Sequence, residues 1–256
     1  MSWASIVVVH GFGEHGAGLP YRLLRGWLEA ADVRVAIPDL PGHGSRPGAR
    51  GHIRRWDEYR DTVLEAAHTM PAPRFLAGLS LGGLIVLEAA IMRSEGLSGI
   101  ISAAPPLGRT AIPSFFIPMA RVMGRVWPGF SMASRLNLEG MTRDRAAMEE
   151  YARDPLFHQR GSAGLLNELL RARERVHAAA PRFPLPLLML WGSADRICAS
   201  DGGFYERCAA PEKDRQQYRG AMHHLFLESN REEIYRDVVD WMRARSGADA
   251  GAPHAG

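Results

Sequence analysis

Short apolar runs alternate along this chain with longer amphipathic segments. The apolar runs predict strands at Ser5–Val9, Val33–Ile37, Arg74–Ala77, Gly99–Ser102 and Leu185–Leu190, and Arg215–Tyr218 is predicted to be a last short strand. Helical spacing follows them at Tyr21–Ala31, Trp56–Met70, Gly83–Ala90, Gly202–Ala210 and Arg231–Arg245. Strands that alternate with helices predict an α/β fold, in which helices cover both faces of a mostly parallel sheet. The carboxyl ends of such strands, and therefore the functional site, are expected along one edge.

The alternation fails between Pro106 and Pro184, where helical patterns occur without a clear strand. This stretch is too long for a structureless loop in a compact domain. We therefore predict a helical cap over residues 106–184, inserted into a core made of residues 1–105 and 185–246. The Gly- and Ala-rich tail, residues 247–256, is predicted to be disordered.

Gly78–Gly82 has the sequence Gly-Leu-Ser-Leu-Gly and lies between a predicted strand and a predicted helix. A G-x-S-x-G pattern in this setting predicts a nucleophile elbow, a sharp turn that presents a serine hydroxyl at the top of a sheet. Both glycines are expected to be necessary, because a side chain there would collide with the closely apposed strand and helix. Ser80 is therefore the candidate nucleophile.

A serine hydroxyl needs a base to take its proton and an acid to orient that base. The order serine, acid, histidine is the one found in hydrolases built on such a sheet. Asp195 follows the strand Leu185–Leu190 and is the candidate acid. His223 and His224 both follow the last predicted strand, and spacing alone does not choose between them. His10 and His43 also lie near strand ends, where we expect them to support loops.

An oxyanion hole requires two backbone N–H groups, one after the nucleophile and one from the loop after an earlier strand. Leu81 is expected to supply the first, and Phe12 the second. Gly11–Gly16 also matches the spacing G-x-G-x-x-G, but no acid stands at the distance that a dinucleotide site requires. No cluster with metal-ligand spacing occurs, so we predict neither a metal nor another cofactor.

Composition excludes some other classes of protein. The 256 residues carry a formal net charge of +3, and no block of like charges suggests binding to nucleic acid. The two cysteines, Cys198 and Cys208, predict free thiols in a reducing compartment. Because neither a signal-peptide pattern nor a membrane-spanning apolar run is present, the sequence predicts a cytoplasmic protein.

These motifs together resemble the monoacylglycerol lipase and lysophospholipase group of the α/β-hydrolase superfamily, which includes the serine aminopeptidase S33 type. The resemblance runs from about Ile6 to Arg245 and is carried by His10–His15, Asp39–Gly44, the elbow, Asp154–Leu156, Gly192–Cys198 and Tyr218–His223. In this group the catalytic histidine is followed by x-Leu-x-x-Glu, a spacing that His223 meets.

The resemblance implies a catalytic triad of Ser80, Asp195 and His223, with the amides of Phe12 and Leu81 as the oxyanion hole. It also implies that Tyr151, in Tyr-x-x-Asp-Pro-Leu, lies near the polar end of the substrate.

Three departures from the group are visible. Leu79 stands where a histidine is usual, and Gly18-Leu19 stand near the place of an Arg-Tyr pair. Both changes remove polar groups from the substrate side, and one lost hydrogen bond is enough to shift headgroup preference by about tenfold. The sequence also begins after the two antiparallel strands that usually come first, so we expect either a smaller sheet with an exposed edge or a natural chain with an earlier start.

The function predicted from the sequence is a serine ester hydrolase that cleaves apolar acyl esters through an acyl-enzyme. Alternatives are an amidase, peptidase or thioesterase with the same triad, and a non-catalytic ligand-binding protein of the same fold. The apolar segment Ile112–Phe130 is expected to pack on the core, to line an acyl-chain pocket or to touch a membrane surface transiently. A small lipid or ester is the expected substrate, and the oligomeric state is left open.

Overall fold

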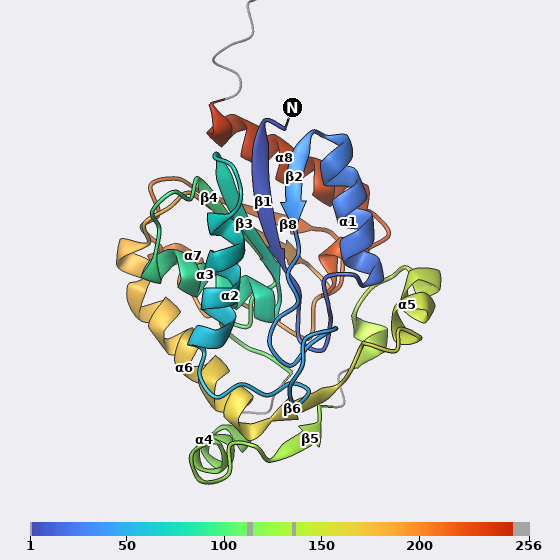
Figure 1. Ribbon diagram of the computed structural model, residues 1–256, viewed down its shortest axis with the longest axis vertical. Helices are drawn as coiled ribbons and strands as arrows, with labels where there is room; N and C mark the ends of the chain where they lie inside the picture. Colours follow the sequence, from blue (N-terminus) through green and yellow to red (C-terminus); the bar gives the residue numbers. More distant parts are fainter. Residues whose placement is uncertain (1, 112–114, 135–136, 248–256) are drawn as a thin grey trace, which may run out of the picture.

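The computed structural model describes residues 2–111, 115–134 and 137–247, and its centre is a six-stranded sheet (Figure 1). The strand order is β2-β1-β3-β4-β7-β8, and each neighbouring pair is parallel. The strands are β1 (Ala4–Val9), β2 (Val33–Ala36), β3 (Arg74–Leu79), β4 (Gly99–Ala103), β7 (Leu187–Gly192) and β8 (Lys213–Tyr218). The α/β class with a mostly parallel sheet is confirmed.

Helices cover both faces of this sheet because successive strand side chains point to opposite sides. Ile6 and Val8 of β1 pack in one cluster with α1 (Leu19–Ala30) and α8 (Arg231–Ser246). Val7 and Val9 pack in the other, with α2 (Asp57–His68), α3 (Leu81–Met92), α6 (Ala163–Ala179) and α7 (Phe204–Arg207).

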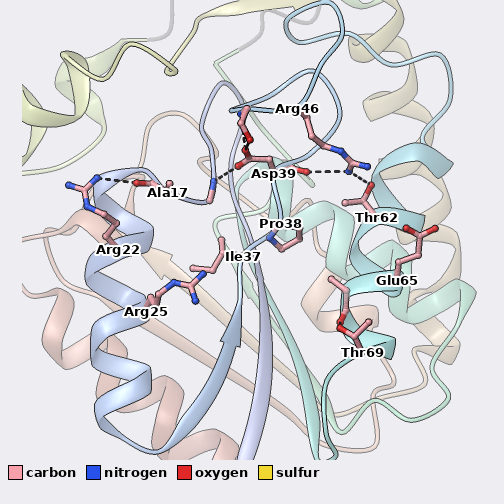
Figure 2. Close-up of a pocket in the computed structure, with 13 residues that line it drawn as sticks. Ala17, Arg22, Arg25, Ile37, Pro38, Asp39, Arg46, Thr62, Glu65 and Thr69 are labelled. Atoms are coloured by element: carbon pink, nitrogen blue, oxygen red, sulfur yellow. Dashed lines mark hydrogen bonds between the residues drawn. The ribbon is translucent and has the colours of Figure 1, made fainter.

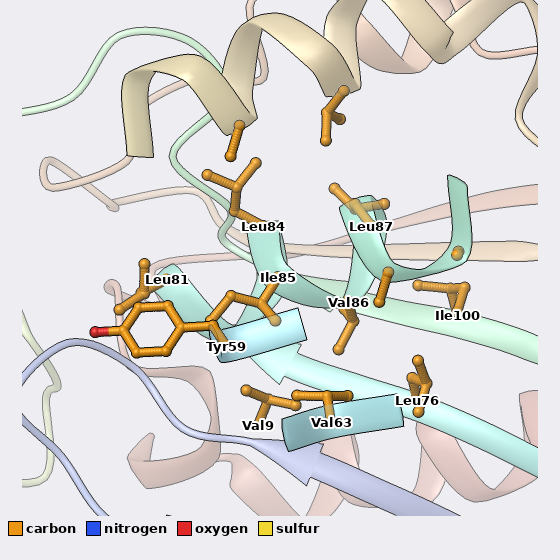
Figure 3. Packing of buried hydrophobic residues seen from close by; sticks show 14 of the residues in the cluster. Val9, Tyr59, Val63, Leu76, Leu81, Leu84, Ile85, Val86, Leu87 and Ile100 are labelled. Carbon is orange, nitrogen blue, oxygen red and sulfur yellow. The ribbon is translucent and has the colours of Figure 1, made fainter. Parts of the chain in front are cut away.

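Figure 3 shows the second of these clusters at the level of α3. Side chains of α3 and α2 meet Val9, Leu76 and Ile100 from three neighbouring strands. Nearly every residue of α3 is buried. Packing on nearly all sides therefore holds the N-terminus of α3 in place, and Ser80 immediately precedes it.

Strand β2 forms one edge of the sheet. Within the described residues, the two antiparallel strands that are usual in the related group have no counterpart. The edge is protected locally, since Arg25 Nη1 of α1 donates a hydrogen bond of 3.2 Å to the Val35 carbonyl.

The segment between β4 and β7 holds α4 (Phe116–Val126), β5 (Ser131–Ala133), η1 (Leu138–Gly140), α5 (Arg145–Ala152), β6 (Arg160–Ser162) and α6, followed by η2 (Ala180–Arg182). Strands β5 and β6 pair antiparallel, although the sequence predicted no clear strand here. Three residues carry too little alternation to reveal a strand. Helix α6 packs along α3, and Arg175 Nε lies 3.0 Å from Glu88 Oε1 between them.

Two predicted features lie partly outside the described residues. These are the start of the apolar segment, at 112–114, and the tail from 248 onward. Among the described helices, none combines the length and hydrophobicity that crossing a lipid bilayer requires.

Candidate active site

Ser80 occupies the turn between β3 and α3 with a positive φ of 55° and ψ of −116°. This conformation is strained for a residue with a side chain and is typical of functional sites. The flanking glycines make the turn possible. A Cβ on Gly78 would lie 2.3 Å from the Gly82 carbonyl carbon, and a Cβ on Gly82 would lie 2.1 Å from the Val9 oxygen.

Asp195 and His223 are in direct contact, at the ends of β7 and β8. His223 Nδ1 donates to Asp195 Oδ2 at 2.9 Å, and the amides of Ile197 and Cys198 donate to Asp195 Oδ1 at 2.7 and 3.0 Å. Burial alone would raise the pKa of Asp195, but the His223 hydrogen bond and charge and these two amides lower it. The ionised carboxylate therefore orients the imidazole through Nδ1, and no hydrogen bond of Nε2 occurs among the described residues.

Ser80 lies beside the loop that carries Asp195. Its side chain interacts with the Cys198 thiol, whose pKa is raised by burial. None of the hydrogen bonds among the described residues joins Ser80 to His223. Catalytic hydrogen bonds are often long in the absence of substrate, so this geometry keeps Ser80 as a candidate nucleophile.

The two backbone amides predicted to form the oxyanion hole have no acceptor within the described part of the chain. One belongs to Phe12, in the loop after β1, and the other to Leu81, the first residue of α3. The Leu81 amide also lies at the positive end of the helix dipole. Gly13 brings the first loop close to the segment between β4 and β7, because a Cβ there would lie 1.9 Å from the His158 carbonyl oxygen.

Leu79, Tyr151 and His224 are also candidates for the site from the sequence, but among the described residues their side chains form no hydrogen bond with Asp195 or His223 and have other partners. Leu79 is 1% exposed and packs in the cluster under α1 and α8. Tyr151, of α5, is buried and its hydroxyl donates to Glu14 Oε1 at 2.8 Å. His224 Nε2 lies 2.6 Å from the same oxygen, so His223 and not His224 meets Asp195.

The other two histidines near strand ends are buried and hold backbone groups. His10 Nδ1 donates to the Gly11 carbonyl and Nε2 accepts the Leu40 amide. His43 Nδ1 donates to the Pro41 carbonyl, and burial lowers the pKa of His43 to about 3.

Two carboxylates near the site were missed by the reasoning from sequence. One is Glu14, which accepts the Gly11 amide at 2.6 Å. Glu228 is fully buried, accepts the Met222 amide at 2.7 Å and pairs with Arg143 Nε at 2.9 Å. It therefore connects the start of the His223 loop to Arg143 in the segment between β4 and β7. Both glutamates belong to recognised motifs, but sequence does not show that their side chains are buried.

A cleft of about 770 Å³ lies away from these groups, beyond the end of β2 and between α1 and α2 (Figure 2). Its lining includes Arg25, Asp39 and Arg46, and none of the predicted site residues. A much smaller cavity, of about 10 Å³, is lined by Glu14, Tyr151 and their neighbours. In the described ranges no group of three or more His, Cys, Asp or Glu side chains is arranged to hold a metal ion.

A parallel sheet with a serine on a strained strand-to-helix turn, and an Asp–His pair at the same edge, defines the α/β-hydrolase class. A family model described as serine aminopeptidase, S33, matches residues 2–230, and the chain belongs to that family.

Similar proteins agree with this assignment. The monoglyceride lipase of Rattus norvegicus is 31% identical over 94% of this chain and 83% of the relative. Phospholipase YtpA of Bacillus subtilis is 29% identical over 91% and 92%. The crystal structure of the monoacylglycerol lipase of Paleococcus ferrophilus superposes with a TM-score of 0.88, at 33% identity and 94% coverage of both chains.

Proposed function

We propose that this protein is a serine ester hydrolase that cleaves apolar acyl esters through an acyl-enzyme. The observation that carries the proposal is the hydrogen bond of 2.9 Å between His223 and Asp195, at the edge where Ser80 occupies the strained turn. Relatives named monoglyceride lipase and phospholipase support an ester as the substrate. The proposal needs no cofactor.

In this mechanism Ser80 Oγ attacks the ester carbonyl while His223 Nε2 accepts the hydroxyl proton. The amides of Phe12 and Leu81 donate to the oxyanion. His223 then returns the proton to the leaving alcohol, and Asp195 stabilises the imidazolium. Water activated by His223 releases the carboxylic acid and restores Ser80.

Replacing the nucleophile is the direct test. Ser80→Ala is expected to lower kcat for a p-nitrophenyl ester by about 10⁴-fold or more, and to abolish labelling by a fluorophosphonate. Ser94→Ala is the matched control, because Ser94 lies beyond the far end of α3. Residual hydrolysis in Ser80→Ala comparable with that of the control would exclude the proposal. Absence of labelling and hydrolysis in the wild type would favour the non-catalytic alternative.

The substrate class is a finer proposal. Leu79 is buried and the Tyr151 hydroxyl is bound to Glu14, so neither side chain offers a free polar group to a leaving group. We therefore expect simple alkyl esters to be cleaved at least as well as monoglycerides. The test is a panel that varies headgroup and chain length, with matched amides and thioesters to separate the alternative reactions.

Residues 106–184 are proposed to act as a cap whose helix α4 touches a lipid surface. Apolar side chains on and next to α4 are exposed, among them Val122, Val126 (77%) and Trp127 (60%). Burying such side chains in lipid is favourable by about 1–3 kcal/mol each. The double variant Val122→Glu/Val126→Glu should bind phosphatidylcholine–phosphatidylglycerol vesicles at least about tenfold more weakly.

Met92→Glu is the matched control for this experiment, since Met92 is an exposed apolar side chain at the end of α3. Hydrolysis of a water-soluble ester should be unchanged in both variants. Equal vesicle binding by the wild type and the α4 variant would rule out this role for α4.

A further inference from the structure

The Glu14 carboxylate is 4% exposed and accepts four hydrogen bonds. Oε2 accepts from the Gly11 amide at 2.6 Å and from the Tyr21 hydroxyl. Oε1 accepts from the Tyr151 hydroxyl at 2.8 Å and lies 2.6 Å from His224 Nε2. A carboxylate has about four acceptor sites, so donors from the protein itself occupy all the acceptor sites of Glu14.

The four donors come from four separate segments of the chain. Gly11 lies in the loop after β1, Tyr21 on α1, Tyr151 on α5 of the cap segment, and His224 in the loop after β8. Burial alone would raise the pKa of Glu14. The charge and hydrogen bond of His224 and the two tyrosine hydroxyls outweigh it and lower the pKa to about 2. Glu14 is therefore ionised at neutral pH.

Gly11 connects this carboxylate to the proposed oxyanion hole. Its N–H is held by Glu14 and by the Tyr21 hydroxyl at 3.0 Å. The next amide, of Phe12, has no acceptor among the described residues. The contact is also close, since a Cβ on Gly11 would lie 2.6 Å from Glu14 Oε2. Fixing the Gly11 amide fixes the chain immediately before the Phe12 amide.

His224 connects the same carboxylate to the proposed base. Among the described residues, the His224 ring bonds to Glu14 through Nε2, and its Nδ1 has no hydrogen-bond partner. Its amide donates to the Met141 carbonyl of the cap segment at 2.7 Å. Because His224 directly follows His223, holding one ring in place limits the movement of the other.

We propose that Glu14 is a positioning residue, whose carboxylate holds the Phe12 amide and the His223 imidazole in the relative positions that the transition state requires. The inference rests on the proposed function and deepens it. Both groups act mainly as charge develops during the reaction, so a loss of position lowers kcat more than it raises KM. Tyr151 then contributes through Glu14 and not by contact with the substrate.

The test is the kinetics of Glu14→Gln on a water-soluble p-nitrophenyl ester, with active sites counted by fluorophosphonate labelling. An amide presents N–H groups to donors that need acceptors, so the network loses two of its bonds. Displacements of about 1 Å near reacting groups cost up to about 100-fold. We expect kcat per labelled site to fall about 10- to 100-fold, with KM within about twofold of the wild type.

Glu88→Gln is the matched control, because Glu88 is an equally buried carboxylate that contacts α6 and not the site. It should leave kcat per labelled site unchanged, whatever it does to the thermal midpoint. If Glu14→Gln lowers only the thermal midpoint and keeps kcat, Glu14 has a purely structural role and the inference fails.

Tyr21→Phe and Tyr151→Phe make the test independent of whether Glu14→Gln folds. Each removes one donor, and each should lower kcat by about 2- to 10-fold. A raised KM with unchanged kcat in Tyr151→Phe would instead indicate direct contact with the substrate and overturn the inference. Failure of the proposed function is distinguishable, because the wild type itself would then show no hydrolysis that depends on Ser80.

Discussion

Glu14 and Glu88 are buried to nearly the same degree, yet their pKa values are shifted in opposite directions. Glu14 accepts four hydrogen bonds, and its pKa is lowered to about 2. Glu88, on α3, has one hydrogen bond, from Arg175, and its Oε2 has no partner within the described residues. Burial raises the pKa of Glu88 more than Arg175 and Arg60 lower it.

The number of available donors explains this difference. Burial penalises the charged form of both carboxylates, and only hydrogen bonds or opposite charges compensate. Glu88 lies between two helices, whose backbone N–H groups are already bonded within each helix. Glu14 lies where four segments meet, and its donors are the tyrosine hydroxyls of two helices together with the Gly11 amide and the His224 ring from two loops. A buried charge is therefore stabilised where several segments supply side-chain and loop donors, which the interface between α3 and α6 does not do.

The largest expected effect is on stability when Glu14 is removed. Glu14→Leu leaves the Tyr21 and Tyr151 hydroxyls and the His224 ring without their acceptor, whereas the Gly11 amide keeps the Tyr21 hydroxyl. It should lower the free energy of unfolding by about 3–5 kcal/mol. Glu88→Leu should change it by no more than about 1 kcal/mol, because Arg175 is 40% exposed and is rehydrated. Urea denaturation of both variants measures the contrast, and equal losses would refute the explanation from donor number.

The two carboxylates should also give stability opposite dependences on pH. The folded pKa of Glu14 lies below its ordinary value of 4.5, so its contribution is complete above about pH 4.5 and is lost as pH falls toward 2. That contribution is up to about 3 kcal/mol. The folded pKa of Glu88 lies above 4.5, so its ionisation costs stability as pH rises, and acid relieves this cost.

Urea denaturation from pH 6 to pH 3 measures these slopes. Glu14→Gln should flatten the loss of stability in acid, whereas Glu88→Gln should make that loss steeper. The same sign of change in both variants would contradict the assigned pKa directions.

The smallest expected effect concerns the ion pair between Glu88 and Arg175. Arg175→Met removes a half-exposed partner and should lower the free energy of unfolding by about 1 kcal/mol. In the Glu88→Leu background the same substitution should have almost no effect. A double-mutant cycle in urea measures the coupling, and a coupling near zero would mean that Glu88 gains nothing from Arg175.

Local constraints explain which parts of the fold were predictable. The inner strands β1, β3, β4 and β7 are apolar runs, whereas the edge strand β8 is mostly polar. The elbow is specified within Gly78–Gly82 by two glycines, because a Cβ at either position would clash with backbone atoms. Strands β5 and β6 were missed because each has three residues and depends on its partner.

The two adjacent histidines show what local constraints leave open. Spacing alone allowed either His223 or His224 as the base, and the family motif favoured His223. The structure separates them by their partners, since His223 meets Asp195 after β7 and His224 meets Glu14 after β1. Those partners are 28 and 210 residues away in the chain, so sequence spacing carries no information about them.

The sequence by itself determined the α/β class, the family motifs and the turn that presents Ser80, because these depend on neighbouring residues and on hydrophobic periodicity. Only the tertiary structure decided that Leu79 is buried, that Tyr151 bonds to Glu14, and that Glu14 gathers donors from four segments. Burial and donor number are properties of how distant segments pack. They set the charge state of a side chain without leaving a pattern in the sequence around it.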